Sequence, residues 1–321
     1  MTYLKRIIGT VLFALAFCLI MRVLSPIFEP KNNDPQSGIE EVEASGILGE
    51  PDNSIDVVFF GDSVAFCAFN PLEIWKTHGY TSYMCATSGQ TMDYAKISLK
   101  RLLKKQAPKL LVVETDTFYR EQDLTDRVYS DVREAFTVVR YHNRWKMLSA
   151  ADFTTAPNYT WKEDYKGYHL KTDRQAATNP NYMAPTDEVE QASFFNRDSF
   201  LAIKKVCDDN GIALVLISAP SATNWNYARH NALVKIAEEA GVEFYDLNLM
   251  TEEVPIDWAN DSLDGGDHLN IFGTRKVDAW FVEYLASTGL VDSRRDDPNL
   301  RHWDEALGRY ENALPEGVPV V

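Results

Sequence analysis

Short apolar segments alternate with helical segments from about residue 56 to residue 288, and this alternation limits the fold more than any other feature. Gly211 and Gly241 each stand where a helix exits through the left-handed conformation, and an apolar strand follows each of them. Such units connect parallel strands by right-handed crossovers. The pattern predicts an α/β fold, a three-layer α/β/α sandwich with a mostly parallel five-stranded sheet. We expect strands near residues 57–60, 81–86, 110–114, 213–218 and 243–246, and helices near residues 92–106, 194–210, 227–240 and 271–287.

The N-terminal segment is apolar and has basic flanks. Residues 7–21 carry no charge, Lys5 and Arg6 precede them, and Arg22 follows. The run is shorter than the roughly 20 apolar residues that cross a bilayer, but a snorkelling Arg22 and the two apolar residues after it extend it. A cleaved signal peptide is the alternative, although no clean small-x-small motif follows. We expect an uncleaved single-pass anchor at residues 1–25, with the rest of the chain extracytoplasmic because basic residues stay inside.

The remaining chain divides by composition. Residues 26–54 are rich in Pro, Asn, Asp, Glu and Gly and suit a linker. The α/β pattern predicts one domain over residues 55–290, and a charged tail follows at residues 291–321. The alternation lapses at about residues 118–189, where many Tyr and Trp residues occur. This insertion is either an aromatic cap that stacks on sugar rings or a small core of its own.

Composition excludes several classes of function. The formal net charge of −15 disfavours nucleic acid and anionic membrane surfaces as partners, because both would be repelled. The sequence has no Gly-rich phosphate loop and no zinc-ligand spacing, so we expect neither a cofactor nor a metal. Three cysteines lie outside the apolar run, and we expect buried thiols rather than a bridge between Cys67 and Cys85.

The first strand ends at residues 61–63 (Gly-Asp-Ser), which would deliver one hydroxyl to the carboxyl edge of the sheet. A serine hydroxyl is a weak nucleophile unless a base takes its proton. Residues 264–270 (Asp-Gly-Gly-Asp-His-Leu-Asn) follow the fifth strand and supply a histidine with acids. Among the six histidines, only His268 is expected on that edge next to acids, and His230 is the other histidine that could lie near the site. We therefore expect Ser63 as nucleophile and His268 as its base.

Two aspartates compete to orient His268. Asp267 is adjacent to the histidine in sequence, and adjacent side chains generally diverge. Asp264 is four residues away, and the flexible pair Gly265-Gly266 would let the chain fold it back toward the imidazole. Asp264 is the preferred acid and Asp267 the alternative.

These motifs resemble those of the SGNH (GDSL-type) hydrolases over roughly residues 55–288. The anchor, residues 70–75 (Asn-Pro-x-x-Ile-Trp) and residues 87–90 (Thr-Ser-Gly-Gln) resemble its extracytoplasmic branch, which is related to teichoic-acid D-alanine transfer and alginate O-acetylation proteins. The resemblance implies a flavodoxin-like fold and a serine esterase or O-acyltransferase. It also implies that the backbone N–H groups of Ser63 and Gly89 stabilise the oxyanion.

The third sequence block departs from the family pattern. Residues 114–116 (Glu-Thr-Asp) replace the usual Gly-x-Asn-Asp, so the asparagine that would donate to the oxyanion is missing. Asp116 must point elsewhere, be protonated or bind a cationic group of the substrate. Asn224 and Trp225 lie beyond the fourth strand as further candidate substrate contacts, and a structured loop with a helix cap explains them equally well.

The sequence therefore predicts a membrane-anchored extracytoplasmic serine esterase or O-acyltransferase. Its expected substrates are acyl esters of a cell-envelope polysaccharide or teichoic-acid-like polymer, and a transmembrane acyl-passing protein is an expected partner. The alternative is a non-catalytic accessory protein that binds a glycan or a membrane acyltransferase partner. The changed third block and the irregular spacing of the acid motivate this alternative.

Overall fold

A computed structural model describes residues 2–179, 181–315 and 318. The chain forms two compact units. The N-terminal unit comprises residues 1–42 and 123–161, and the sheet unit comprises residues 43–122 and 162–321.

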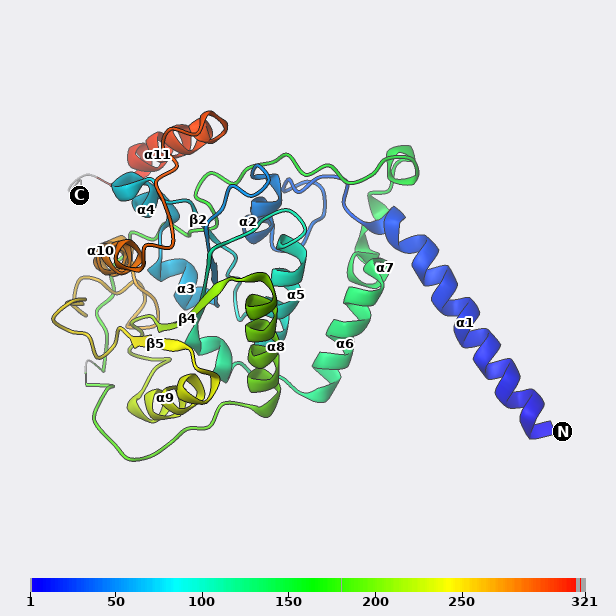
Figure 1. Cartoon of the computed structure of the whole chain (residues 1–321), viewed down its shortest axis with the longest axis horizontal. Coiled ribbons are helices and arrows are strands. Elements are labelled where there is room, and N and C mark those ends of the chain that lie inside the picture. Colours follow the sequence, from blue (N-terminus) through cyan, green and yellow to red (C-terminus); the bar gives the residue numbers. More distant parts are fainter. Residues whose placement is uncertain (1, 180, 316–317, 319–321) are drawn as a thin grey trace. The chain divides into compact units, whose positions relative to one another are not determined.

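Five parallel strands form the centre of the sheet unit in the order β2-β1-β3-β4-β5 (Figure 1). The strands are β1 (Val57–Phe60), β2 (Ser82–Met84), β3 (Leu110–Glu114), β4 (Ala213–Ser218) and β5 (Glu243–Asp246). Val57 of β1 lies opposite both Ser82 and Leu110, so β1 lies between β2 and β3, and β3 is the central strand of the five. The predicted α/β class and the parallel five-stranded sheet are confirmed.

Helices cover both faces of this sheet because successive strand residues point to opposite sides. Val57 and Phe59 pack with residues of α3 and α10, whereas Val58 and Phe60 pack with residues of α5, α8 and α9. The helices of the sheet unit are α3 (Ser63–Ala68), α4 (Pro71–His78), α5 (Met92–Leu102), α8 (Phe194–Asn210), α9 (Tyr227–Ala240), α10 (Ile271–Thr288) and α11 (Arg301–Ala313). Shorter turns are α2 (Val42–Ser45), η1 (Gly46–Gly49), η2 (Thr115–Tyr119) and η5 (Pro298–Leu300).

The C-terminal helix α11 packs firmly on the sheet unit. Trp303 and Tyr310 are fully buried, and the Tyr310 hydroxyl donates to Glu73 Oε1 at 2.8 Å. The expected buried thiols are also confirmed, since Cys67, Cys85 and Cys207 are free and buried.

The N-terminal unit combines a long apolar helix with part of the insertion. Its elements are α1 (Thr2–Phe28), α6 (Leu124–Ala135), α7 (Thr137–Arg140), η3 (His142–Lys146) and η4 (Ala150–Phe153). Helix α1 is long and apolar enough to cross a membrane, by length and composition, and is the one such helix among the described residues. Thr137 Oγ1 donates to Ser25 O at 2.9 Å, and Arg144 Nη1 donates to Phe28 O at 2.7 Å. The C-terminal end of α1 is thus held by α7 and η3.

Candidate active site

Ser63 is the first residue of α3, directly after the turn that leaves β1. Asp62 caps this helix, because its Oδ1 accepts a hydrogen bond from Val64 N at 2.8 Å. A Cβ at Gly61 would lie 2.4 Å from the Cβ of Ala65, so only glycine fits this turn. The turn places Ser63 at the carboxyl edge of the sheet. Within the described part of the chain, its hydroxyl makes no hydrogen bond.

The loop that carries His268 is fixed by the residue that caps the next helix. Asn270 Oδ1 accepts from Phe272 N at 3.0 Å at the start of α10. Its Nδ2 reaches back and donates to Asn260 O at 2.8 Å and Ser262 O at 3.2 Å. Asn270 therefore closes the loop, and His268 is held two residues before the helix.

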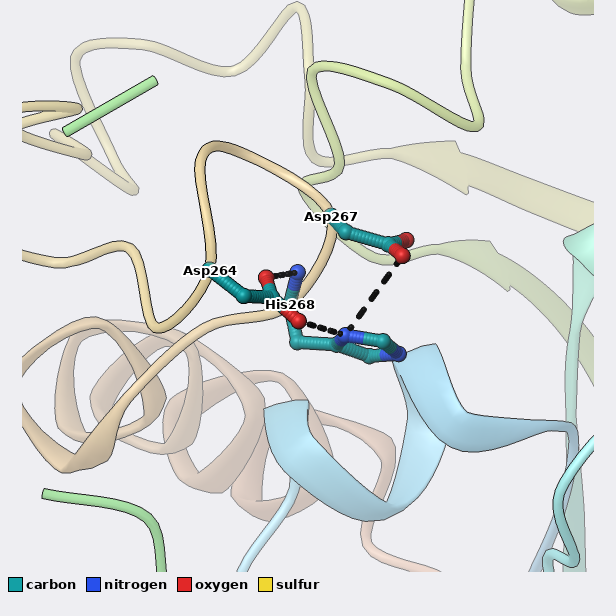
Figure 2. A group of neighbouring side chains, drawn as sticks. All are labelled: Asp264, Asp267 and His268. Carbon is teal, nitrogen blue, oxygen red and sulfur yellow. Dashed lines mark hydrogen bonds and ion pairs between the residues drawn. The ribbon is translucent and has the colours of Figure 1, made fainter. Parts of the chain in front are cut away.

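Asp264 is the closer acid to His268 (Figure 2). Asp264 Oδ2 lies 2.6 Å from His268 Nδ1, and Asp264 Oδ1 accepts from the His268 backbone N at 2.9 Å. Gly265 and Gly266 have φ values of +87° and +106°, which only glycine adopts readily, and they turn the chain back as expected. Asp267 Oδ2 is 3.7 Å from Nδ1, beyond hydrogen-bond distance.

The other imidazole nitrogen faces helix α3. Figure 2 shows the ring of His268 pointing toward the light-blue helix, and Thr274 at the start of α10 donates to Cys67 O at 2.6 Å. Burial raises the pKa of the Cys67 thiol to about 12, and the charges of Asp264 and Asp267 contribute to this shift. Cys67 lies one turn after Ser63 on the same helix face. The His268 loop therefore lies near the helix that Ser63 begins.

His268 Nε2 is buried and has no hydrogen-bond partner among the residues that the structure describes. No hydrogen bond joins it to Ser63 in this state. Catalytic hydrogen bonds of unliganded enzymes are often long and tighten only when substrate binds. A buried imidazole nitrogen without a hydrogen-bond partner can accept a hydrogen bond from a hydroxyl group.

The loop at residues 87–90 is hydrogen-bonded to the turn before Ser63. Gln90 Oε1 accepts from Gly61 N at 3.1 Å, and Thr87 N donates to Gly61 O at 3.2 Å. Gly89 is exposed with φ of +61°, and no atom lies within 4 Å of where its Cβ would be. Its peptide group is thus open to an approaching ligand beside the turn.

A cluster of three carboxyl groups and two arginines lies beside the same turn. Arg120 Nε donates to Asp62 Oδ2 at 2.6 Å, and Arg120 also donates to Asp116. Arg229 Nη1 donates to Asp116 Oδ1 at 3.0 Å. Glu114 Oε2 accepts from Asp116 N at 3.0 Å, which completes this carboxylate–arginine cluster. Asp116 therefore pairs with cations of the protein itself.

Burial governs protonation in this cluster. It raises the pKa of Asp116 to about 8 and that of Glu114 well above its usual value, and the charge of Asp62 adds to both shifts. Charge counting agrees in direction, because Asp62, Glu114, Asp116 and the Arg229 partner Glu190 outnumber the two guanidinium groups. Sequence analysis missed Arg120 and Arg229. The one available signal was that Arg120 follows Asp116 by four residues at the same sheet edge.

The residues beyond β4 separate into two groups. Asn224 Nδ2 donates to Asp267 Oδ1 and so joins the His268 loop. Trp225 is buried, and its indole donates to Asp246 Oδ2 at 2.9 Å, so its side chain lies in the core. His230 Nδ1 lies 2.8 Å from the same Asp246 oxygen. The expectation that His268 alone lies next to an acid at this edge is wrong, because Asp246 ends β5 and faces α9.

The insertion does not form a single element. Residues 123–161 belong to the N-terminal unit, while residues 171–177 run beside the His268 loop. Gln175 N donates to Ser262 O at 3.0 Å, and Gly265 N donates to Gln175 O at 3.1 Å. Tyr182 and Trp258 line a cavity of about 210 Å³ beyond β4 and β5, together with Pro220, Leu247, Asn248, Thr251, Val254, Pro255, Ile256 and Asp257.

The His268 group also has the composition of a small cation site. Asp264, Asp267 and His268 offer three ligand atoms within 4.8 Å of one another, although sequence analysis expected no metal. A cation held by these three atoms through Nδ1 would displace the contact between Asp264 and the imidazole. His268 cannot bind a cation through Nδ1 and be oriented by Asp264 at the same time. Removing a bound cation with a chelator would distinguish these two roles.

Comparisons with known proteins gave similarities of structure alone. No protein-family model matches the chain, and no curated protein matches it. A GDSL-like lipase from Bacteroides thetaiotaomicron is 14% identical, with 73% of this chain and 89% of that chain covered and a TM-score of 0.35. A lipase/acylhydrolase from Enterococcus faecalis is 14% identical over 73% and 96% of the two chains, with a TM-score of 0.37. An acetyl xylan esterase is 13% identical over 72% and 100%, with a TM-score of 0.38. The structures found include GDSL-like lipases, the superfamily that the sequence motifs resemble. Because their sequence identities and TM-scores are low, the activity must be argued from the site itself.

Proposed function

We propose that this chain is a serine ester hydrolase or O-acyltransferase of the SGNH type, anchored in the membrane with its sheet unit extracytoplasmic. The observation that carries the proposal is the pairing of His268 Nδ1 with Asp264 at 2.6 Å, which leaves a buried, partnerless Nε2 turned toward α3. Ser63 begins that helix. A base oriented by an acid beside a serine is the arrangement that nucleophilic acyl transfer requires.

The proposed reaction has two halves. In the first, Ser63 Oγ attacks the acyl carbonyl carbon while His268 Nε2 takes the hydroxyl proton, and Asp264 stabilises the imidazolium. The N–H groups of Ser63 and Gly89 donate to the oxyanion, the ester C–O bond breaks, and the imidazolium protonates the leaving alcohol. In the second half, water or an acceptor hydroxyl attacks the acyl-enzyme, His268 takes its proton, and Ser63 leaves with that proton.

The proposed substrate is an acylated cell-envelope polysaccharide or teichoic-acid-like polymer. Helix α1 would hold the enzyme at the membrane, where such polymers are assembled, and a transmembrane acyl-passing protein would supply the acyl group for transfer. The net charge of −15 favours neutral or cationic acyl-bearing groups, such as acetylated sugars or alanyl esters with a free amine. Hydrolysis and transfer share the first half-reaction and differ only in the acceptor.

Turnover of small acetyl and alanyl esters tests the proposal. Ser63→Ala and His268→Ala are expected to lower kcat by at least about 10³-fold while the circular dichroism spectrum stays unchanged. Ser287→Ala and His142→Ala are matched controls, because both residues are exposed and remote from the loop of His268 in sequence. Equal activity in wild type and Ser63→Ala would reject the enzymatic proposal.

A non-catalytic accessory role is the second candidate. It is favoured by the absence of a hydrogen bond between Ser63 and His268 among the described residues, and by the Asp116 carboxylate where the family has an oxyanion donor. Glycan or partner binding that persists in Ser63→Ala, together with no turnover by the wild type, would select this role.

A further inference from the structure

Helix α6 of the N-terminal unit is amphipathic and presents its apolar side outward. Leu124, Val128 and Val132 recur every four residues and therefore form one stripe along the helix. Their side chains are 63%, 54% and 39% exposed, and Tyr129 beside them is 52% exposed. None of the residues of α6 is buried.

The half-buried positions of α6 are polar instead. Arg127, Ser130 and Arg133 are the half-buried positions of its two middle turns, and Arg133 pairs with Glu40 of the same unit. A surface helix of a water-soluble protein normally buries its apolar stripe and exposes its charges. The reversed orientation indicates that the apolar stripe of α6 is covered by something outside the chain.

The position of α6 within its unit suggests what covers it. The C-terminal end of α1 is tied to α7 and η3, and α6 runs directly into α7. Figure 1 shows α1 and α6 diverging from the neighbourhood of α7. If α1 spans a bilayer, its end at Phe28 marks the membrane surface, so α7 and the C-terminal end of α6's apolar stripe, at Val132, are held close to that surface.

Further apolar side chains within residues 123–161 are exposed. Trp145, Met147 and Phe153 are 63%, 49% and 63% exposed, and Lys146 Nζ lies 5.6 Å from the Trp145 ring centre. Tryptophan beside a basic residue is typical of the membrane–water interface, where the ring sits at headgroup level and the charge reaches water.

Charge also separates the two units. Residues 1–42 and 123–161 contain nine basic and nine acidic residues, so the formal charge of −15 lies entirely in the sheet unit. A neutral segment with exposed apolar residues can approach a bilayer, whereas an acidic one is repelled by anionic lipid. Residues 123–161 are thus the part of the extracytoplasmic chain that can bind a lipid surface.

We propose that residues 123–161 form a second membrane contact, in which the apolar stripe of α6 and the Trp145, Met147 and Phe153 side chains enter the headgroup–acyl boundary of the outer leaflet. This inference rests on the proposed anchoring by α1. The occupant of the surface is zwitterionic lipid rather than a protein. The chain would therefore be attached to the bilayer twice, by the membrane-spanning helix α1 and by the exposed apolar residues of 123–161.

Fluorescence depth measurements on the full chain test this contact. The protein is reconstituted in phosphatidylcholine vesicles with an environment-sensitive nitrobenzoxadiazole label on a single reactive cysteine. Cys18 is exposed and reports α1, whereas Cys18→Ala with Val128→Cys reports the apolar stripe. Cys18→Ala with Glu134→Cys is the matched control, because Glu134 is exposed and lies on the side of α6 that carries Arg127 and Ser130.

The label at position 128 is expected to be blue-shifted and quenched at least twofold by lipids carrying a shallow spin label, whereas the label at position 134 is quenched by aqueous iodide. Equal iodide quenching at both positions, with Cys18 in lipid, would overturn the surface contact and leave the anchor intact. A Cys18 label in water would overturn both. A blue shift at position 128 that depends on protein density, without lipid quenching, would assign the stripe to a second copy and overturn the lipid contact. Ester turnover plays no part in these readouts.

Discussion

Replacing each of the two aspartates near His268 by asparagine distinguishes their roles. Asp264 Oδ2 is 2.6 Å from His268 Nδ1, and Asp267 Oδ2 is 3.7 Å from it. Asp264→Asn removes the negative charge that would stabilise the imidazolium, and its amide can donate to Nδ1. That donation would favour the tautomer that carries its proton on Nε2, where the base must be free.

The geometry sets the expected size of each effect. A hydrogen bond to a charged group contributes about 1.5–3 kcal/mol, and a tenfold change in rate corresponds to about 1.4 kcal/mol. The Asp264 side chain is 38% exposed, so water screens part of this interaction. We expect kcat to fall roughly 10- to 100-fold in Asp264→Asn, less than the about 10⁴-fold at a buried catalytic aspartate. An exposed pair at the distance of Asp267 contributes about 0–1 kcal/mol, which limits the effect of Asp267→Asn to about fivefold.

Steady-state kinetics with a soluble aryl acetate would measure both variants, with thermal unfolding as the control for folding. Asp264 is the orienting acid if its variant loses kcat with little change in KM while the Asp267 variant stays near wild type. A larger loss in Asp267→Asn than in Asp264→Asn would refute the assignment. Equal small losses in both would refute any oriented base at His268.

Three further predictions follow from the site and its surroundings. Treatment with EDTA should leave ester turnover within twofold of the untreated enzyme, and a loss that added divalent cation restores would assign Asp264, Asp267 and His268 to a metal. Because the pKa of Asp116 is raised to about 8, the folded state keeps a proton that the unfolded state loses near its ordinary value of 3.8. Stability should therefore fall as pH rises between these values, by at most about 1.4 kcal/mol per pH unit for one proton. The thermal midpoint between pH 6 and pH 9 should fall less steeply in Asp116→Asn, and identical slopes would contradict the shift. Gly61→Ala should destabilise the protein in urea by about 1–3 kcal/mol through overpacking, whereas Gly89→Ala, which meets no atom within 4 Å, should cost about 1–2 kcal/mol from its positive φ alone. A smaller loss for Gly61→Ala than for Gly89→Ala would contradict the packing around the Ser63 turn.

The sheet could be predicted because most of its strands are short apolar runs, and Gly61, Gly211 and Gly241 mark the end or the approach of three of them. Residues 57–60, 110–114, 213–218 and 243–246 were assigned to the strands that the structure contains. Helices α3 and α4 were missed because they are only six and eight residues long, which leaves too few turns for an apolar period to appear. Their capping residues, Asp62 and Asn70, were the local signal.

The carboxylate–arginine cluster could not be predicted from local patterns. It joins residues separated by 58 positions (Asp62 and Arg120) and by 113 positions (Asp116 and Arg229), and nothing in either neighbourhood specifies the partner. Asp264, by contrast, was identifiable because the glycines that fold it back lie beside it in sequence. The stripe of α6 was also visible in the spacing of its apolar residues, but its outward orientation depends on contacts that only the fold provides.

Mass spectrometry after labelling with a fluorophosphonate probe tests the central claim most directly, because this probe reacts with serines that a base has activated. We expect one adduct on the peptide that contains Ser63, no adduct in Ser63→Ala, and labelling slowed at least tenfold in His268→Ala. An unlabelled wild type, or equal labelling of the wild type and Ser63→Ala, would contradict it.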